Sequence, residues 1–121
     1  MTLERTYSYL GPAGTFTEAA LAQVPEAKHQ NWKPVSNVAQ ALADVTDGTS
    51  DGAILAIENT VEGGVSSVQD ALARTKGLRI VGEYLVPVSF VLVAPRGTVL
   101  EDVREVAAHP VAYAQCLDWL G

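Results

Sequence analysis

The segment that most limits how this chain can fold is an uninterrupted apolar run, Ala53 to Ile57, that stops at an acid and an amide, Glu58 and Asn59. Two adjacent glycines, Gly63 and Gly64, follow, and a helix-like pattern begins after them. A continuous apolar run of this length is typical of a strand that is buried on both faces of a sheet. Because open α/β sheets bind ligands outside the carboxyl ends of their strands, the segment predicts an α/β fold with a ligand site at Glu58 and Asn59.

The beginning of the chain has the pattern strand, glycine turn, helix. Residues 6–10 alternate aromatic and polar side chains, as strands do, and a tight turn follows at Gly11 to Gly14. Thr15 and Glu18 have the spacing of a capping box, which predicts Thr15 as the N-cap of a helix. Apolar residues then recur at helical spacing until Pro25, where this first unit is expected to end.

A second unit of the same kind has weaker signals. Residues 32–35 are expected to form a strand, and residues 38–45 carry an apolar helical face. Ser36 or Asn37 can cap this helix, and Gly48 is expected to end it. The apolar run described above is then the third strand.

After the third strand the pattern changes from alternating strands and helices to β structure. A short helix with Val68, Ala71 and Leu72 on its inward face is expected, with Ser66 or Ser67 as its cap and Lys76-Gly77 as its end. Residues 78–86 and 88–94 are strand-like runs separated by a proline. This change indicates that the chain crosses into a second lobe.

The last part of the chain is expected to be mainly helical. Residues 100–103 predict a helical turn and residues 106–108 a brief strand. His109 and Pro110 begin a last helix, because proline is well tolerated at the first helical position. The apolar face of this helix consists of Tyr113, Cys116, Leu117 and Leu120.

Composition excludes several classes of protein. With 48% hydrophobic and 18% charged residues among 121, the chain is globular and long enough for one domain with a core. The 14 acids outnumber the 8 bases, and the net charge of -6 argues against nucleic acid or an anionic membrane as the main partner. A single cysteine permits no intrachain disulfide, and no signal peptide or membrane-spanning run is visible. A soluble, cytoplasmic protein is expected.

Two segments could carry chemistry, and each also has a purely structural interpretation. The turn from Gly11 to Thr15 could bring backbone N–H groups to a carboxylate or phosphate, or it could simply join a strand to a helix. Glu58, Asn59 and Thr60 could hold, polarise or protonate a substrate, with Glu62 nearby, or they could form a helix-capping loop. The residues alone leave both alternatives open.

A third candidate segment lies near the end of the sequence. His109 stands at the start of a predicted helix, where it could contact a ligand or cap the helix, and Gln115 lies next to the apolar face. Cys116 is expected to pack in the core rather than act as a nucleophile. Two histidines and one cysteine in separate elements make no visible metal-ligand set.

Together, these three segments resemble the prephenate dehydratase family. The matching motifs are Tyr9 to Ala20, Ile57 to Val65, and His109-Pro110 with Ala114 to Cys116. They occur in the family's order and spacing and span nearly the whole chain. Three motifs in order are far more specific than any one of them.

The resemblance implies a cytoplasmic lyase of phenylalanine biosynthesis that converts prephenate to phenylpyruvate with loss of carbon dioxide and water. It implies a catalytic domain with two lobes of the periplasmic-binding-protein type (type II), here about residues 1–84 for the first lobe and about 85–121 for the beginning of the second. No metal or organic cofactor is expected. A dimer or tetramer is expected, as is phenylalanine as an effector that binds a C-terminal ACT domain absent from this chain.

The resemblance also assigns roles to individual residues. The positions that match the family's active site are Glu58, Asn59 and Gln115, and those that match its substrate-binding segments are Gly11, Pro12, Gly14, Thr15, Thr60 and His109. Two positions depart from the family pattern, because Ala108 stands where a serine is expected and Thr60 replaces a serine but keeps a hydroxyl. The family's essential Thr-Arg-Phe motif is absent and would lie beyond Gly121, so the isolated chain is expected to be a fragment without activity.

Two other interpretations remain open at this stage. The chain could be a binding module that holds a small aromatic or dicarboxylic acid on the same fold without turning it over. It could also be an inactive piece of the enzyme that serves only in assembly or crystallisation. A downstream Thr-Arg-Phe motif would favour the enzyme, whereas the sequence does not tell whether arogenate is also a substrate.

Overall fold

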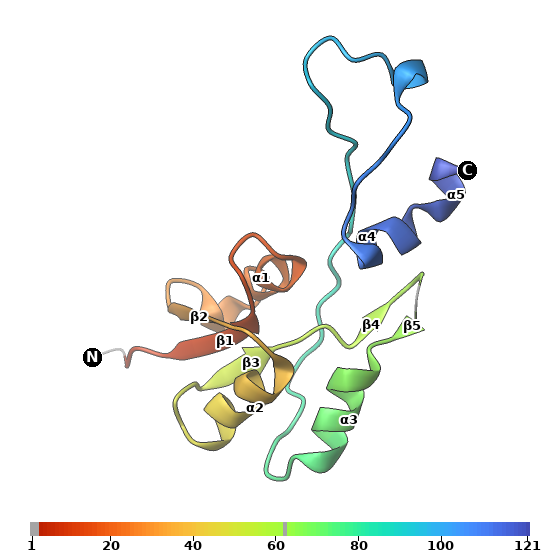
Figure 1. Cartoon of the computed structure of the whole chain (residues 1–121). Coiled ribbons are helices and arrows are strands. Elements are labelled where there is room, and N and C mark those ends of the chain that lie inside the picture. Colours follow the sequence, from red (N-terminus) through yellow and green to blue (C-terminus); the bar gives the residue numbers. More distant parts are fainter. Residues whose placement is uncertain (1–2, 62) are drawn as a thin grey trace. The chain divides into compact units, whose positions relative to one another are not determined.

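Two units make up the chain in the computed structural model, which describes residues 3–61 and 63–121 (Figure 1). The first unit ends at Pro87 and the second begins at Val88. Glu62, the acid next to the predicted site, lies outside the described residues.

The first unit is built around β1 (Thr6–Leu10), the middle strand of a parallel sheet. β1 pairs with β2 (Asn31–Val35) on one side and with β3 (Gly52–Ile54) on the other, so the strand order is β2-β1-β3. Tyr9 marks the register, because it lies opposite Pro34 in β2 and Ile54 in β3. The mixed α/β fold with a parallel sheet is confirmed.

Each face of the sheet is covered by its own helix (Figure 1). Tyr9 faces α1 (Phe16–Leu21), and Ser8, the preceding residue of β1, faces α2 (Val38–Thr46). The connection from β1 to β2 and the connection from β2 to β3 run in opposite directions across the sheet. Because such crossovers are right-handed, opposite directions place the two helices on opposite faces.

The face of α1 holds the apolar core. Tyr9, Leu21 and Ala27 are almost completely buried there. The Trp32 indole packs against them and donates a hydrogen bond of 2.8 Å from Nε1 to the carbonyl oxygen of Ala27, which ends the short 3-10 helix η1 (Pro25–Ala27). Further side chains that pack against this core are Tyr7, Val24 and Ile54.

The face of α2 holds a buried polar cluster, which the sequence did not predict. Asp44 is 1% exposed, although it belongs to the helix whose inward face was expected to be apolar. Its carboxylate accepts hydrogen bonds from the Ser8 hydroxyl (3.0 Å) and the Gln40 amide (2.7 Å), and it forms an ion pair with Lys33. Ser50 completes the cluster, with its hydroxyl oxygen 2.6 Å from that of Ser8.

Two of the predicted helix caps are confirmed and one is wrong. The Thr15 hydroxyl caps α1 by accepting from the Glu18 N–H, and the Asn37 side chain caps α2 by accepting from the Gln40 N–H. α3 (Ser66–Arg74), in contrast, starts after Val65 with no side-chain cap, because Ser66 and Ser67 already lie within the helix. Local spacing therefore places this helix start a residue or two too late.

The third strand is shorter than the sequence predicts, and its two-sided burial is wrong. β3 includes only Gly52–Ile54, and residues 55–57 continue beyond the sheet, with Ile57 46% exposed. Ala53 is also exposed. In the described residues β3 pairs with β1 alone, so one edge and part of its faces remain uncovered.

The strands predicted at 78–86, 88–94 and 106–108 are not formed in the described part of the chain. A strand needs a neighbour that receives its backbone hydrogen bonds, and no such neighbour is present for these segments among residues 3–61 and 63–121. The side chains nevertheless keep a two-residue alternation, since Phe90 and Leu92 are 40% and 41% exposed whereas Val91 is 82% exposed.

The second unit contains η2 (Leu100–Asp102), α4 (Pro110–Gln115) and α5 (Leu117–Leu120). The single last helix of the sequence analysis is divided at Cys116, whose backbone (φ -108°, ψ 7°) is not helical. Its apolar face is not buried, because Tyr113 and Leu117 are each 49% exposed. Within residues 3–61 and 63–121, no helix combines the length and apolar character that crossing a membrane requires.

Candidate functional site

The first two predicted segments follow neighbouring strands of the same parallel sheet. The glycine turn begins directly after β1, and the segment leading to Glu58 begins directly after β3. Because β1 and β3 are parallel, both segments leave the sheet at its carboxyl edge. The order β2-β1-β3 makes this pair of strands a topological switch point, where adjacent loops diverge and ligands of α/β sheets bind.

Close packing explains the glycine at the start of the first loop. The Gly11 N–H donates to the carbonyl oxygen of Val35 (2.9 Å) and so continues the pairing of β1 with β2. A Cβ atom on Gly11 would lie 2.8 Å from the Cβ of Pro34, too close for an ordinary contact. The Gly11-Pro12 peptide bond is cis, and Gly14 has a φ of 90°, which few other residues adopt.

The hydroxyl of Thr15 is occupied within the loop. It accepts from the Glu18 N–H (3.3 Å) and lies 3.2 Å from the carbonyl oxygen of Leu10, to which it donates. Thr17 donates to the same carbonyl oxygen at 2.8 Å. The end of β1 and the start of α1 are therefore connected by side-chain hydroxyls as well as by the chain itself.

Glu18 also contributes its carboxylate to this loop, a role that the sequence analysis did not assign. One carboxylate oxygen accepts from the Tyr9 hydroxyl (2.9 Å), and the other accepts from the Gly14 N–H (3.2 Å). Burial is the main reason why the pKa of the Tyr9 hydroxyl lies above its ordinary value, and the hydrogen bond to Glu18 raises it further. The spacing of Thr15 and Glu18 predicts a capping box, in which the carboxylate accepts from the N–H of the cap residue, Thr15. In the structure the carboxylate accepts from the Gly14 N–H instead, one residue earlier.

The second segment forms a small hairpin. Glu58 and Asn59 make up β4 (Glu58–Asn59), which pairs antiparallel with β5 (Gly63–Gly64). The Asn59 side chain accepts from the Val61 N–H at 2.9 Å and so stabilises the turn, whereas Glu58 and Thr60 are exposed. The hairpin presents a carboxylate, an amide and a hydroxyl in consecutive residues.

The base of this hairpin is held by backbone and amide contacts. The carbonyl oxygen of Ile57 accepts from the Val65 N–H (2.9 Å) and from the Gln69 side chain (3.4 Å). A Cβ atom on Gly64 would collide with the Gln69 amide, at 2.5 Å from its nitrogen, and Gly63 has a φ of 86°. The backbone conformation therefore favours glycine at position 63, whereas a side chain at position 64 would require the Gln69 amide to move.

The third predicted segment belongs to the second unit. His109 is the N-cap of α4, where its Nδ1 accepts from the Val111 N–H at 3.2 Å. Gln115, at the end of α4, donates from its side-chain nitrogen to the carbonyl oxygen of Val111 at 3.3 Å. Both side chains are thus engaged within their own helix, and Cys116 beside them is partly buried.

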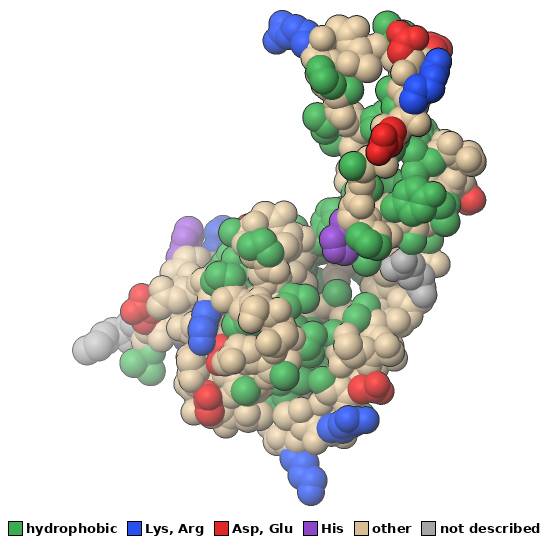
Figure 2. All heavy atoms as spheres, viewed as in Figure 1, with side chains coloured by type: hydrophobic (Ala, Val, Ile, Leu, Met, Phe, Trp, Pro, Cys, Tyr) green, Lys and Arg blue, Asp and Glu red, His purple; other side chains and the backbone are tan. Residues whose placement is uncertain are grey.

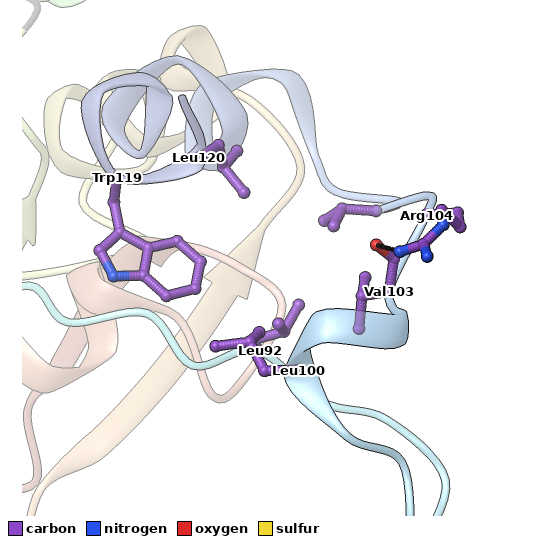
Figure 3. Close-up of a pocket in the computed structure, with 7 residues that line it drawn as sticks. Leu92, Leu100, Val103, Arg104, Trp119 and Leu120 are labelled. Atoms are coloured by element: carbon purple, nitrogen blue, oxygen red, sulfur yellow. Dashed lines mark hydrogen bonds between the residues drawn. The ribbon is translucent and has the colours of Figure 1, made fainter.

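The second unit also contains an apolar hollow, separate from these residues. Figure 2 shows hydrophobic side chains open at its surface, and in Figure 3 the Trp119 indole projects from α5 towards Leu92 and Leu100. The hollow has a volume of about 370 Å³. Its lining consists of Leu92, Leu100, Val103, Arg104, Val106, Trp119 and Leu120, and includes none of the predicted site residues.

Potential metal ligands are not clustered in the described residues. Within residues 3–61 and 63–121, no three His, Cys, Asp or Glu side chains lie close enough together to hold a metal ion. The polar groups that the two segments of the first unit present are hydroxyls, an amide, a carboxylate and backbone N–H groups.

Comparison with known proteins relates this arrangement to one family. The sequence model of the family described as "Prephenate dehydratase" matches residues 7–121. Curated proteins of that name from Mycobacterium tuberculosis and Corynebacterium glutamicum are 42% and 37% identical over 93% of the chain. The chain spans 38% of the length of each of these relatives.

A solved structure gives the same result. The crystal structure of prephenate dehydratase from Arthrobacter aurescens in complex with L-Phe is 50% identical, with a TM-score of 0.79. The match covers 95% of this chain and 38% of that protein.

Proposed function

This chain belongs to the prephenate dehydratase family, and we propose that it forms part of an enzyme that converts prephenate to phenylpyruvate in phenylalanine biosynthesis. The observation that carries this proposal is the extent of the family match, which runs from residue 7 to residue 121 and includes every predicted site residue. Since the chain spans 38% of the relatives' length, the activity is proposed for the full-length gene product that carries this sequence.

The fold that we propose for this enzyme has two lobes of the periplasmic-binding-protein type, with the active site in the cleft between them. In this proposal about residues 1–84 form the first lobe and about 85–121 begin the second. The strand order β2-β1-β3 and the two loops at its switch point support the first lobe as one wall of the cleft.

The reaction itself explains which groups the enzyme needs. The bond between the ring and its carboxylate breaks to release CO2, and its electron pair makes the ring aromatic as the ring hydroxyl departs. That hydroxyl leaves as water after taking up one proton, so the prephenate dianion becomes the phenylpyruvate monoanion. Oriented hydrogen-bond donors in a closed cleft can favour this step without a metal or an organic cofactor.

We assign the chemical roles to three residues. Asn59 and Gln115 orient the substrate through their side-chain amides, and Glu58 binds near the departing hydroxyl or positions a neighbouring group. The support for Glu58 and Asn59 is their place in the hairpin that follows β3. Gln115 is assigned through the family motif that it matches.

The remaining assignments concern substrate binding. The first loop would contact the substrate through Gly11, Pro12, Gly14 and Thr15, with a substrate carboxylate near the Gly14-Thr15 start of α1. Thr60 would supply a hydroxyl from the hairpin, and His109 an imidazole.

Regulation and assembly are part of the same proposal. The Arthrobacter aurescens relative was crystallised with L-Phe. We infer that phenylalanine acts as an effector of the full-length protein through an ACT domain, in a dimer or tetramer located in the cytoplasm.

The test is phenylpyruvate formation from prephenate by the full-length gene product that carries this sequence. Asn59→Ala should lower turnover by more than tenfold, while Asn31→Ala should leave it unchanged, because Asn31 begins β2 at the opposite end of the sheet. Equal turnover by both variants would remove Asn59 from the site. We expect no turnover by the isolated 121 residues, and measurable activity would contradict this part of the proposal.

A further inference from the structure

We propose that Glu18 is a positioning residue that holds the loop from Gly11 to Thr15 in its ligand-binding shape. The proposal concerns a residue outside the predicted site, and its kinetic consequence rests on the proposed function. Three atoms of Glu18 make the relevant contacts, and each contact reaches a different residue of the loop or of the strand before it.

The carboxylate of Glu18 joins the strand to the loop. One oxygen accepts from the Tyr9 hydroxyl at 2.9 Å, and the other accepts from the Gly14 N–H at 3.2 Å. Tyr9 is 2% exposed and packs in the core of the first unit, so it provides a rigid anchor. Gly14 is exposed and depends on such contacts for its position.

The backbone of Glu18 holds the next residue of the same loop. Its N–H donates to the Thr15 hydroxyl at 3.3 Å, and that hydroxyl also lies 3.2 Å from the carbonyl oxygen of Leu10. Glu18 therefore contacts two consecutive loop residues while its carboxylate is fixed to β1. A change at this one side chain should shift the loop relative to the sheet.

A carboxylate suits this position because both of its oxygens accept. The Gly14 N–H precedes the start of α1, where backbone donors gather and a negative charge is favourable. A glutamine could retain both contacts, since its oxygen can accept from Gly14 and its NH2 group can donate to the Tyr9 oxygen. An alanine would lose both contacts, so the two substitutions separate the loss of the negative charge from the loss of the hydrogen bonds.

The carboxylate also occupies a donor that an anionic ligand could use. Two opposite effects on substrate affinity are therefore conceivable when it is removed: loss of loop shape weakens binding, and release of the Gly14 N–H with loss of negative charge strengthens it. The positioning proposal requires the first effect to dominate.

The first experiment needs no activity. In the full-length gene product that carries this sequence, the Gly14 amide resonance and its hydrogen-exchange protection are compared for the natural sequence, Glu18→Ala, Glu18→Gln and Tyr9→Phe. We expect at least tenfold faster exchange of the Gly14 amide in Glu18→Ala and a change of less than threefold in Glu18→Gln. Glu26→Ala is the matched control, because this exposed acid in η1 is expected to leave Gly14 unchanged. An unchanged Gly14 amide in folded Glu18→Ala would overturn the proposal.

The second experiment measures the kinetic consequence in the full-length gene product. Glu18→Ala should raise the KM for prephenate at least fivefold with kcat changed less than twofold, and Glu18→Gln should restore the KM to within twofold. A lower KM in both variants would overturn the proposal, since it would show that the carboxylate opposes the substrate. Absence of turnover in the unsubstituted protein would count against the proposed function. The hydrogen exchange of the Gly14 amide would still test the role of Glu18 in that case.

Discussion

The side-chain nitrogen of Lys33 lies 2.9 Å from a carboxylate oxygen of Asp44, and the two side chains differ sharply in exposure, 41% for Lys33 and 2% for Asp44. Lys33 belongs to the middle of β2, and Asp44 belongs to α2, which covers the sheet. Ser8 on β1 donates to the same carboxylate, so this one acid connects two strands with their covering helix. The hydrogen bond from Lys33 lowers the pKa of Asp44, against the opposing effect of burial and with further help from Gln40 and Ser8.

Neutralising this acid should destabilise the protein. We expect Asp44→Asn to lower the midpoint of urea unfolding, because the buried Ser8 hydroxyl and the more exposed Gln40 and Lys33 side chains lose a charged acceptor. Asp44→Ala should lower it further, since no oxygen remains to accept. Asp70→Asn, at an exposed position of α3, is the control and should unfold at the natural midpoint. Equal midpoints for Asp44→Asn and the control would show that the cluster contributes nothing to stability.

The same carboxyl group should make stability depend on acid pH. Its pKa in the folded state is below the ordinary value of 3.8, so its contribution is fully present above that value. As the pH falls below 3.8, the unfolded chain takes up the proton first, and the contribution is lost until the folded carboxyl is also protonated. The difference in unfolding free energy between the natural sequence and Asp44→Asn, measured from pH 7 downwards, should therefore shrink in this range. A difference that stays constant to the acid limit would contradict the lowered pKa.

The apolar face of the sheet should be sensitive to cavities. Leu21 is 1% exposed beside Tyr9, and Leu21→Ala should lower the free energy of unfolding by about 2–5 kcal/mol, the usual range for a buried leucine. Leu3→Ala is the matched control, because Leu3 is 78% exposed and its loss should change stability by less than about 0.5 kcal/mol. The free energy of unfolding of each variant is measured by chemical denaturation. Similar decreases in the two variants would mean that Leu21 does not belong to the core.

Tyr9 should ionise at a higher pH than an ordinary tyrosine. Burial is the main reason, and the bond to Glu18 adds to it, because a phenolate there would face a carboxylate. Tyrosine ionisation is followed by ultraviolet absorbance in the natural sequence and in Tyr9→Phe. The part of the absorbance change that is lost in Tyr9→Phe should have a pKa above the ordinary tyrosine value of 10.0. Since the unfolded chain releases this proton first, the stability due to Tyr9 should decline as the pH rises above 10.0. If the lost part titrates at or below that value, Tyr9 is not buried beside Glu18 in solution.

Short-range patterns account for the predictions that are confirmed. The spacing of Thr15 and Glu18 and the position of Asn37 identify two helix starts, because capping involves residues three apart in sequence. The same reasoning fails at Ser66, where the helix begins one residue earlier and its orphan N–H groups receive no side-chain cap. Residues 78–94 show the other failure, since β-forming side chains make a strand only when a partner strand is present.

Asp44 and Glu18 show why the rest could not be read from patterns. A charged residue in a helix is normally expected at the surface, and its burial depends on partners that lie 36 residues away at Ser8. For Glu18, the pattern identified a capping role, but the bond to Tyr9 depends on how α1 lies across β1. Neither partner can be inferred until the helices are placed on the sheet.

By itself, the sequence determined the α/β class, the alternation of strands and helices in the first half, and the family, because these follow from local periodicity and from motifs read in order. The tertiary structure decided which strand lies in the middle, which acids are buried, and that the loop after β1 and the hairpin after β3 leave the same edge of one sheet. The physical reason is that backbone pairing and desolvation join groups distant in the chain. Their free energy depends on geometry that no local run of residues contains.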